Sequence, residues 1–102
     1  MIPSVGRIVH YKLNEYDAVA INRRRADALA SAIASQQTGA IVHCGNEART
    51  GDVYPLVITR VWNTDPGTIN GQVLLDGNDT LWVTSRVPGD GEGQWSVPPR
   101  VG

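Results

Sequence analysis

Three consecutive arginines, Arg23, Arg24 and Arg25, stand in the middle of the only strong helical pattern in the chain. A guanidinium group binds a carboxylate or a phosphate through two parallel N–H donors. At 100° per residue, Arg25 lies only about 40° from Ile21 and so falls within the apolar stripe of the helix. Because burying an unpaired charge is very costly, Arg25 needs a carboxylate, another subunit or an anionic ligand as its partner.

Two interpretations of the arginines remain open. Successive helix positions diverge by 100°, so at most two of the three side chains can serve one ligand. In the first interpretation, Arg23 and Arg24 are solvated and Arg25 pairs with Asp76 or Asp79. In the second, the arginines recognise the phosphates of a ligand through bidentate contacts.

The segment from Asp76 to Asp79 is the second candidate site. Composition alone favours a plain hairpin tip. An exposed Asn78 can nevertheless recognise a base or a ribose hydroxyl, because its amide is both a donor and an acceptor. Trp82 shares a strand face with Thr84 and can offer a flat surface to a purine, although tryptophans in small sheet proteins most often belong to the core.

The remaining reactive residues do not form a catalytic group. His43 and Cys44 are adjacent in a predicted strand, so they point to opposite faces and cannot act together. With His10 they lack the spacing of metal ligands, and the chain has no phosphate-binding glycine loop or serine-nucleophile motif. We therefore expect a binding protein rather than an enzyme, with no catalytic residue, no metal and no cofactor.

The composition is that of one globular domain, which we assign to residues 1–102. A net charge of −1 argues against bulk attraction to nucleic acid or to an anionic membrane, so we expect neither DNA nor a membrane as a partner, but it leaves room for one local basic pocket. A single cysteine excludes an intrachain disulfide, which suits the cytosol. The chain starts without the apolar core of a signal peptide, and residues 28–46 are too polar to span a membrane.

The first half of the chain predicts a strand, a helix and a short strand. The first strand covers Val5 to Tyr11, with Val5, Arg7, Val9 and Tyr11 on one face. Asn14 caps the helix with Asp17 three residues on, and the helix runs from Glu15 to Gln36. A short apolar strand follows from Ala40 to Cys44.

The second half predicts a sheet. Val53 to Trp62 is apolar on both faces and is placed centrally. The next two strands form a hairpin around a two-residue Gly77–Asn78 turn, which places Val73, Leu75, Thr80 and Trp82 on one face. The tail from Pro88 packs through Trp95. The expected fold is α+β, a small, mostly antiparallel sheet with one long N-terminal helix.

Several segments, taken in order, make the chain resemble a family of small phage proteins, the first type of Thoeris anti-defence protein. They extend from residue 5 to residue 85, and they are Val5 to Tyr11, Ala20 to Arg25, His43 to Asn46, Gly51 to Pro55, Asn70 to Val73, Leu75 to Asp79 and Trp82 to Ser85.

The resemblance implies a sponge. Such proteins bind and sequester cyclic ADP-ribose-type signals in the host cytoplasm, without degrading them, and so starve the defence effector. The family also implies dimers, trimers of dimers and further sites for cyclic oligonucleotides. Carried onto this chain, Arg24, Arg25 and Ala26 would contact phosphates. Asn78 and Asp79 would line a nucleoside pocket at a dimer interface.

Trp82 and Arg86 complete the set of candidate ligand-binding residues, Trp82 because of its stacking surface and Arg86 as a cation after the last matched segment. Two other functions compete with the sponge. One is an enzyme that cleaves a cyclic nucleotide with the help of His10 or His43. The other is a small structural or adaptor module that binds another phage or host protein and places Arg25 in that interface.

Overall fold

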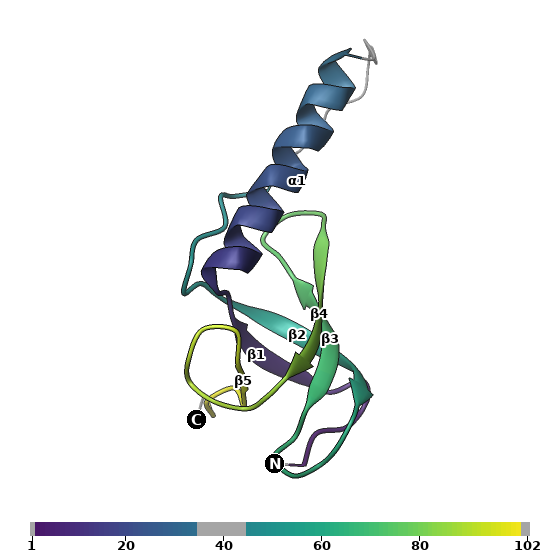
Figure 1. Cartoon of the computed structure of the whole chain (residues 1–102), viewed down its shortest axis with the longest axis vertical. Coiled ribbons are helices and arrows are strands. Elements are labelled where there is room, and N and C mark those ends of the chain that lie inside the picture. Colours follow the sequence, from purple (N-terminus) through teal and green to yellow (C-terminus); the bar gives the residue numbers. More distant parts are fainter. Residues whose placement is uncertain (1, 35–44, 101–102) are drawn as a thin grey trace.

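The computed structural model describes residues 2–34 and 45–100, which form one helix and a five-stranded antiparallel sheet (Figure 1). This is the expected α+β fold, with the helix after the first strand rather than at the very start. The elements are β1 (Ile8–Lys12), α1 (Glu15–Ala34), β2 (Val53–Val61), β3 (Ile69–Leu74), β4 (Thr80–Arg86) and β5 (Trp95–Ser96). The strand order is β4-β3-β2-β1-β5, so β2 is central as predicted.

Strand β1 is shorter than the prediction. Val9 and Tyr11 are fully buried and lie on one face, as the alternation predicts. Val5 and Arg7 precede the strand and are exposed. Their predicted place in the strand, on one face with Val9 and Tyr11, was therefore wrong, because the chain turns at Gly6, whose positive φ of 88° suits a residue without a side chain.

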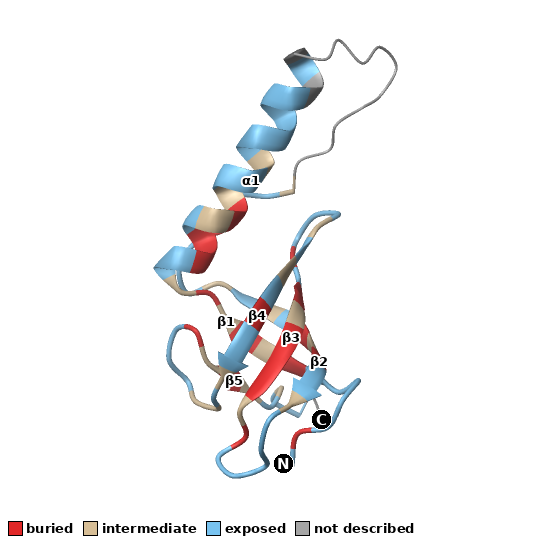
Figure 2. Cartoon of the chain, turned by 45° about the vertical axis from the view of Figure 1, so that its right-hand side comes forward, coloured by how far each residue is buried: buried red, intermediate tan, exposed pale blue. Residues whose placement is uncertain are grey.

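The start of α1 is fixed by reciprocal capping, as the sequence predicts. The Asn14 side chain accepts a hydrogen bond from the backbone N–H of Asp17 at 2.7 Å, and the Asp17 carboxylate accepts one from the backbone N–H of Asn14 at 3.1 Å. Only the first turns of the helix pack on the sheet, through Ala18 and Ile21. The rest projects away from the sheet, and its described side chains from Ala26 onward are exposed (Figure 2).

The β3–β4 hairpin differs from its prediction by one residue of register. Leu74 pairs with Thr80 and Val73 with Leu81, so the connection is five residues long rather than two. A shift of one residue reverses the faces of a strand. Trp82 therefore lies 60% exposed on the side away from the core, and its predicted grouping with buried Val73 was wrong.

The core lies on one face of the sheet. It combines the inward-facing residues of β1 to β4 with five further side chains, which are Leu13, Ile21, Ala48, Leu75 and Trp95. Trp95 is 2% exposed and donates its indole N–H to the carbonyl of Gly67 at 2.9 Å, so the tail is anchored as predicted. The opposite side, which we call the open face, carries the cross-strand row Ile8, Val57, Gln72 and Trp82.

Two predictions remain outside this description. The predicted strand from Ala40 to Cys44 and the predicted helix end at Gln36 lie outside the described residues. Within the described part of the chain, no helix is long and apolar enough to cross a membrane.

Candidate functional site

Arg25 and Asp79 form a two-pronged ion pair between α1 and the β3–β4 connection. Nε of Arg25 lies 2.9 Å from one carboxylate oxygen of Asp79, and Nη2 lies 2.8 Å from the other. The two side chains are 11% and 22% exposed. Nη1 also donates to the backbone carbonyl of Asn46. The structure thus shows the carboxylate pairing that the sequence left as one of two interpretations.

Two glycines enclose the same guanidinium group. A Cβ added to Gly45 would lie 2.7 Å from Nη2 of Arg25, and one added to Gly77 would lie 2.9 Å from it. Real Cβ contacts are almost never shorter than 3.0 Å, and a Cβ at Gly45 would also lie 2.3 Å from the backbone carbonyl oxygen of Asp76, so a larger residue at either position would disturb the packing around Arg25. Arg25 is therefore built into the fold, where it ties the hairpin connection to the helix.

Arg24 shares Asp79 but is far more exposed. Its Nη2 lies 3.3 Å from the Asp79 carboxylate and 2.8 Å from the backbone carbonyl of Thr80. The side chain is 47% exposed. Because a guanidinium has five N–H donors and both contacts use one nitrogen, Arg24 can still present donors to an anion.

The two arginines keep Asp79 ionised. The hydrogen bond from Arg25 holds the pKa of Asp79 below its ordinary value, and the charge of Arg25 and the hydrogen bond from Arg24 act in the same direction. Partial burial opposes them. A ligand phosphate that reaches Arg24 must therefore share the cation with a charged carboxylate.

Two asparagines, Asn46 and Asn22, hydrogen-bond the segment after Gly45 to the β3–β4 connection and to α1. Asn46 donates to the Asp76 carboxylate at 2.5 Å, and its backbone N–H donates to the Asp76 carbonyl at 3.0 Å. On the helix, the Asn22 amide exchanges two hydrogen bonds with the backbone of Ala48, at 2.8 and 3.0 Å. Asn78 stands exposed at the connection itself, next to Asp79.

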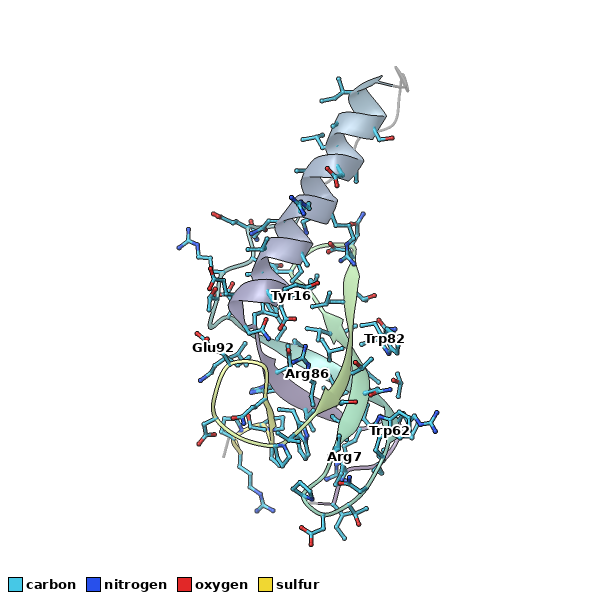
Figure 3. All side chains as sticks on the ribbon, viewed as in Figure 1. Arg7, Tyr16, Trp62, Trp82, Arg86 and Glu92 are labelled. Carbon is cyan, nitrogen blue, oxygen red and sulfur yellow. The ribbon has the colours of Figure 1, made fainter. Side chains whose placement is uncertain are left out.

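A groove of about 330 Å³ lies along α1 beside Arg24. Its lining is Tyr16, Val19, Ala20, Arg23, Arg24 and Asp27. Tyr16 projects from the first turns of α1 (Figure 3) and is 81% exposed, and Val19 is 58% exposed. The groove therefore combines an aromatic ring and an apolar side chain with two cations. All six residues belong to one helix, so the groove is open on the side away from it.

The predicted site residues separate into two groups. Arg24, Arg25 and Asp79 are in contact, with Asn78 and exposed Ala26 next to them in sequence. Trp82 projects from the open face of the sheet, two residues beyond Thr80. The hairpin connection thus gathers the first group but leaves Trp82 on another surface.

Arg86 belongs to a different cluster, at the far end of β4. Its Nη2 lies 3.7 Å from the Asp17 carboxylate, and its guanidinium carbon lies 5.8 Å from the centre of the Tyr11 ring. The hydroxyl group of Tyr11 donates a hydrogen bond to Asp17 at 2.6 Å. The pKa of Tyr11 is raised, mainly because the ring is buried and secondly because of this hydrogen bond. Arg86 thus lies at the capped start of α1, away from Asn78.

Sequence reasoning missed Tyr16, Arg23 and Asp27 as a group. Their spacing is the signal that could have found them, because positions i, i+7 and i+11 share one side of a helix. That side of the helix is opposite to Ile21, so an analysis that considers only the buried apolar stripe does not detect it.

Comparison of the chain with protein-family models, curated proteins and solved structures finds no match. Among the described residues, no group of three histidine, cysteine or acidic side chains is placed to hold a metal ion. The function is therefore argued from the groove and its charges.

Proposed function

We propose that this chain is a phage anti-defence protein that binds cyclic nucleotide immune signals and sequesters them in the host cytoplasm without degrading them. The ligands are cyclic ADP-ribose isomers and, in addition, cyclic oligonucleotides. The observation that carries the proposal is the arginine-bearing groove on α1. Its residues match the parts of such a ligand one by one.

The phosphates of the ligand pair with the exposed arginines. Arg23 and Arg24 both line the groove, and Arg24 is held in place by Asp79 and Thr80. Guanidinium groups suit a pyrophosphate because their donors match its oxygens in pairs. Arg25 helps to hold Arg24 in position indirectly, because both side chains bind Asp79.

The nucleoside parts of the ligand meet the other lining residues. The ring of Tyr16 offers a stacking surface to a base, and Val19 and Ala20 supply apolar contact. The carboxylate of Asp27 accepts hydrogen bonds from ribose hydroxyls. Asn78 and Asp79 reach the ligand from the hairpin connection, beside Arg24. No residue receives a catalytic role.

A second copy of the chain closes the open side of the groove. Tyr16, Val19, Arg23, Ala26, Ala30 and Ile33 follow the three- and four-residue spacing of a helix-packing seam, and all are exposed. Arg23 is the one charged member of this otherwise apolar seam. The small side chains of Ala26 and Ala30 permit close approach of another helix. We propose a homodimer built on this seam, with a trimer of dimers as the larger assembly.

Titration calorimetry with the isomers of cyclic ADP-ribose tests the proposal. We expect tight binding, and chromatography of the ligand released by heat should recover it unchanged. Arg24→Ala should weaken binding by tenfold or more, whereas Arg49→Ala, at a 76% exposed arginine outside the groove, should leave binding unchanged. Recovery of a converted ligand would instead make the protein an enzyme.

The second candidate function is a small phage structural or adaptor module. The exposed apolar seam on α1 favours it, because exposed apolar stripes of this kind also mark protein–protein contacts. Calorimetry separates the two functions, since an adaptor would bind none of the cyclic nucleotides.

A further inference from the structure

The open face of the sheet exposes apolar and aromatic side chains that do not line the groove on α1. Its central row pairs Ile8 with Val57, Val57 with Gln72 and Gln72 with Trp82. Ile8 is 55% exposed and Trp82 is 60% exposed. A tryptophan exposed to this extent on a strand contributes little to the core of its own chain.

Trp62 is a second exposed aromatic residue, and its ring is held in a fixed orientation. Its indole N–H donates to the side chain of Asn70 at 2.9 Å, and the guanidinium of Arg60 lies 3.9 Å from the ring centre. Asn70 is only 6% exposed and also accepts the backbone N–H of Ser85 at 2.8 Å. Trp62 nevertheless remains 51% exposed, so the fixed ring still meets solvent.

The two tryptophans lie on the same side of the sheet (Figure 3). Val61 packs against the core and Val83 is buried, so alternation directs their neighbours Trp62 and Trp82 to the open face. Trp82 pairs with Gln72, and the backbone N–H of Trp62 bonds to Thr68. Thr68 and Gln72 are four positions apart along the chain, which corresponds to about 13 Å of extended strand between the two levels.

The strands of this sheet carry no carboxylate. All ten acidic residues lie in the described part of the chain, and none of them falls within β1 to β5. The strands do carry basic residues, among them Lys12 and Arg60. The open face thus combines two stacking surfaces with basic strand residues, and the strands themselves add no negative charge.

We propose that the open face binds a short segment of single-stranded RNA. Proteins that hold single strands combine aromatic side chains, on which bases stack, with cations that follow the phosphates. Trp62 and Trp82 supply the stacking surfaces, and Arg60 supplies the cation between them. Gln72 adds an amide that can both donate to and accept from a 2′-hydroxyl, the group that distinguishes RNA from DNA.

A second copy of the chain fits this face less well than RNA does. A two-fold dimer would place this patch against the same patch of the other copy, so two surfaces whose strands carry cations would face each other. With no carboxylate on the strands, that arrangement would juxtapose like charges without compensation. Because the face carries few cations and the whole chain has a net charge of −1, we expect the affinity for RNA to be limited.

Fluorescence anisotropy with labelled eight-nucleotide RNA and DNA of the same sequence tests the proposal. We expect the RNA to bind more tightly, with Trp62→Ala and Trp82→Ala each weakening binding about tenfold. Trp82→Phe should retain most of the affinity because it keeps an aromatic face. Arg60→Gln should reduce the slope of log K against log salt by about 0.7, whereas Arg49→Gln should not change it.

Three results would overturn the proposal. The first is equal affinity for RNA and DNA. The second is unchanged RNA affinity in both Trp→Ala variants, provided that their circular dichroism spectra match that of the wild type. The third is an oligomer that dissociates on Trp82→Ala in the absence of RNA. The last result would assign the face to contacts between copies. Trp62→Ala and Arg60→Gln should leave cyclic ADP-ribose calorimetry unaltered, so failure here is distinguishable from failure of the groove on α1.

Discussion

Arg24 and Arg25 are adjacent in sequence, yet the fold gives them different surroundings. A rotation of 100° separates them on the helix, which turns Arg25 into the contact with Asp79 and leaves Arg24 at the surface. The sequence correctly predicted that Arg25 needs a partner, because a charge in an apolar stripe cannot remain unpaired. It could not choose between a carboxylate and a ligand, because that choice depends on a residue 54 positions away.

We expect Arg25→Ala to lower the free energy of unfolding by about 1.5–3 kcal/mol, because it removes charge-assisted hydrogen bonds and leaves Asp79 without its main partner. Arg24→Ala is the matched control and should cost less than about 1 kcal/mol, since Arg24 is 47% exposed. Urea unfolding followed by circular dichroism measures both. An equal loss of unfolding free energy in the two variants would contradict the conclusion that Arg25 is structural and Arg24 is not.

Asp79 should make stability depend on pH in the acid range. Its pKa in the folded protein is lowered from 3.8, so the ionised form is stabilised by folding. This contribution is complete above the unfolded pKa and is lost as the pH falls through the folded pKa. The difference in urea midpoint between the wild type and Asp79→Asn should therefore shrink from pH 6 to pH 3. A difference that stays constant would contradict this account.

At the scale of elements, the sequence predicted most of the architecture. The capped start of α1, the central place of β2 and the anchoring of the tail by Trp95 all follow from local signals, and the structure confirms them. The register of the β3–β4 hairpin was wrong. Its connection is shaped by tertiary contacts, since Asp76 bonds to Asn46 and Asp79 to Arg25, and these contacts override the preference for a two-residue turn.

The capping interaction should be a measurable part of the stability of α1. Asn14→Ala removes the side-chain acceptor for the backbone N–H of Asp17, and we expect a loss of about 1 kcal/mol. Asn78→Ala is a matched control, because Asn78 is exposed at the hairpin connection. Thermal unfolding should show a lower midpoint for the first variant alone. A comparable shift in the second would show that asparagine loss in general lowers stability.

At the scale of the whole molecule, the chain is more extended than a domain of its length. Its radius of gyration is 15.5 Å, against about 13 Å for a compact chain of 100 residues. The projecting part of α1 accounts for this shape (Figure 1). Helices gain most of their stability from packing an apolar face, and this is the reason for proposing that a second copy covers the exposed seam.

We therefore expect Ile33→Asp to convert an oligomer into monomers. Ile33 is 69% exposed near the end of the described helix, so an aspartate there leaves the core intact but places a charge in the proposed seam. Val97→Asp, at a 51% exposed residue of the tail, is the matched control. Sedimentation velocity should show the wild type and the control as oligomers and Ile33→Asp as a monomer. If the second copy completes the groove, nucleotide affinity will fall together with the oligomer, whereas a monomer with full affinity would mean that α1 and the hairpin connection suffice for binding.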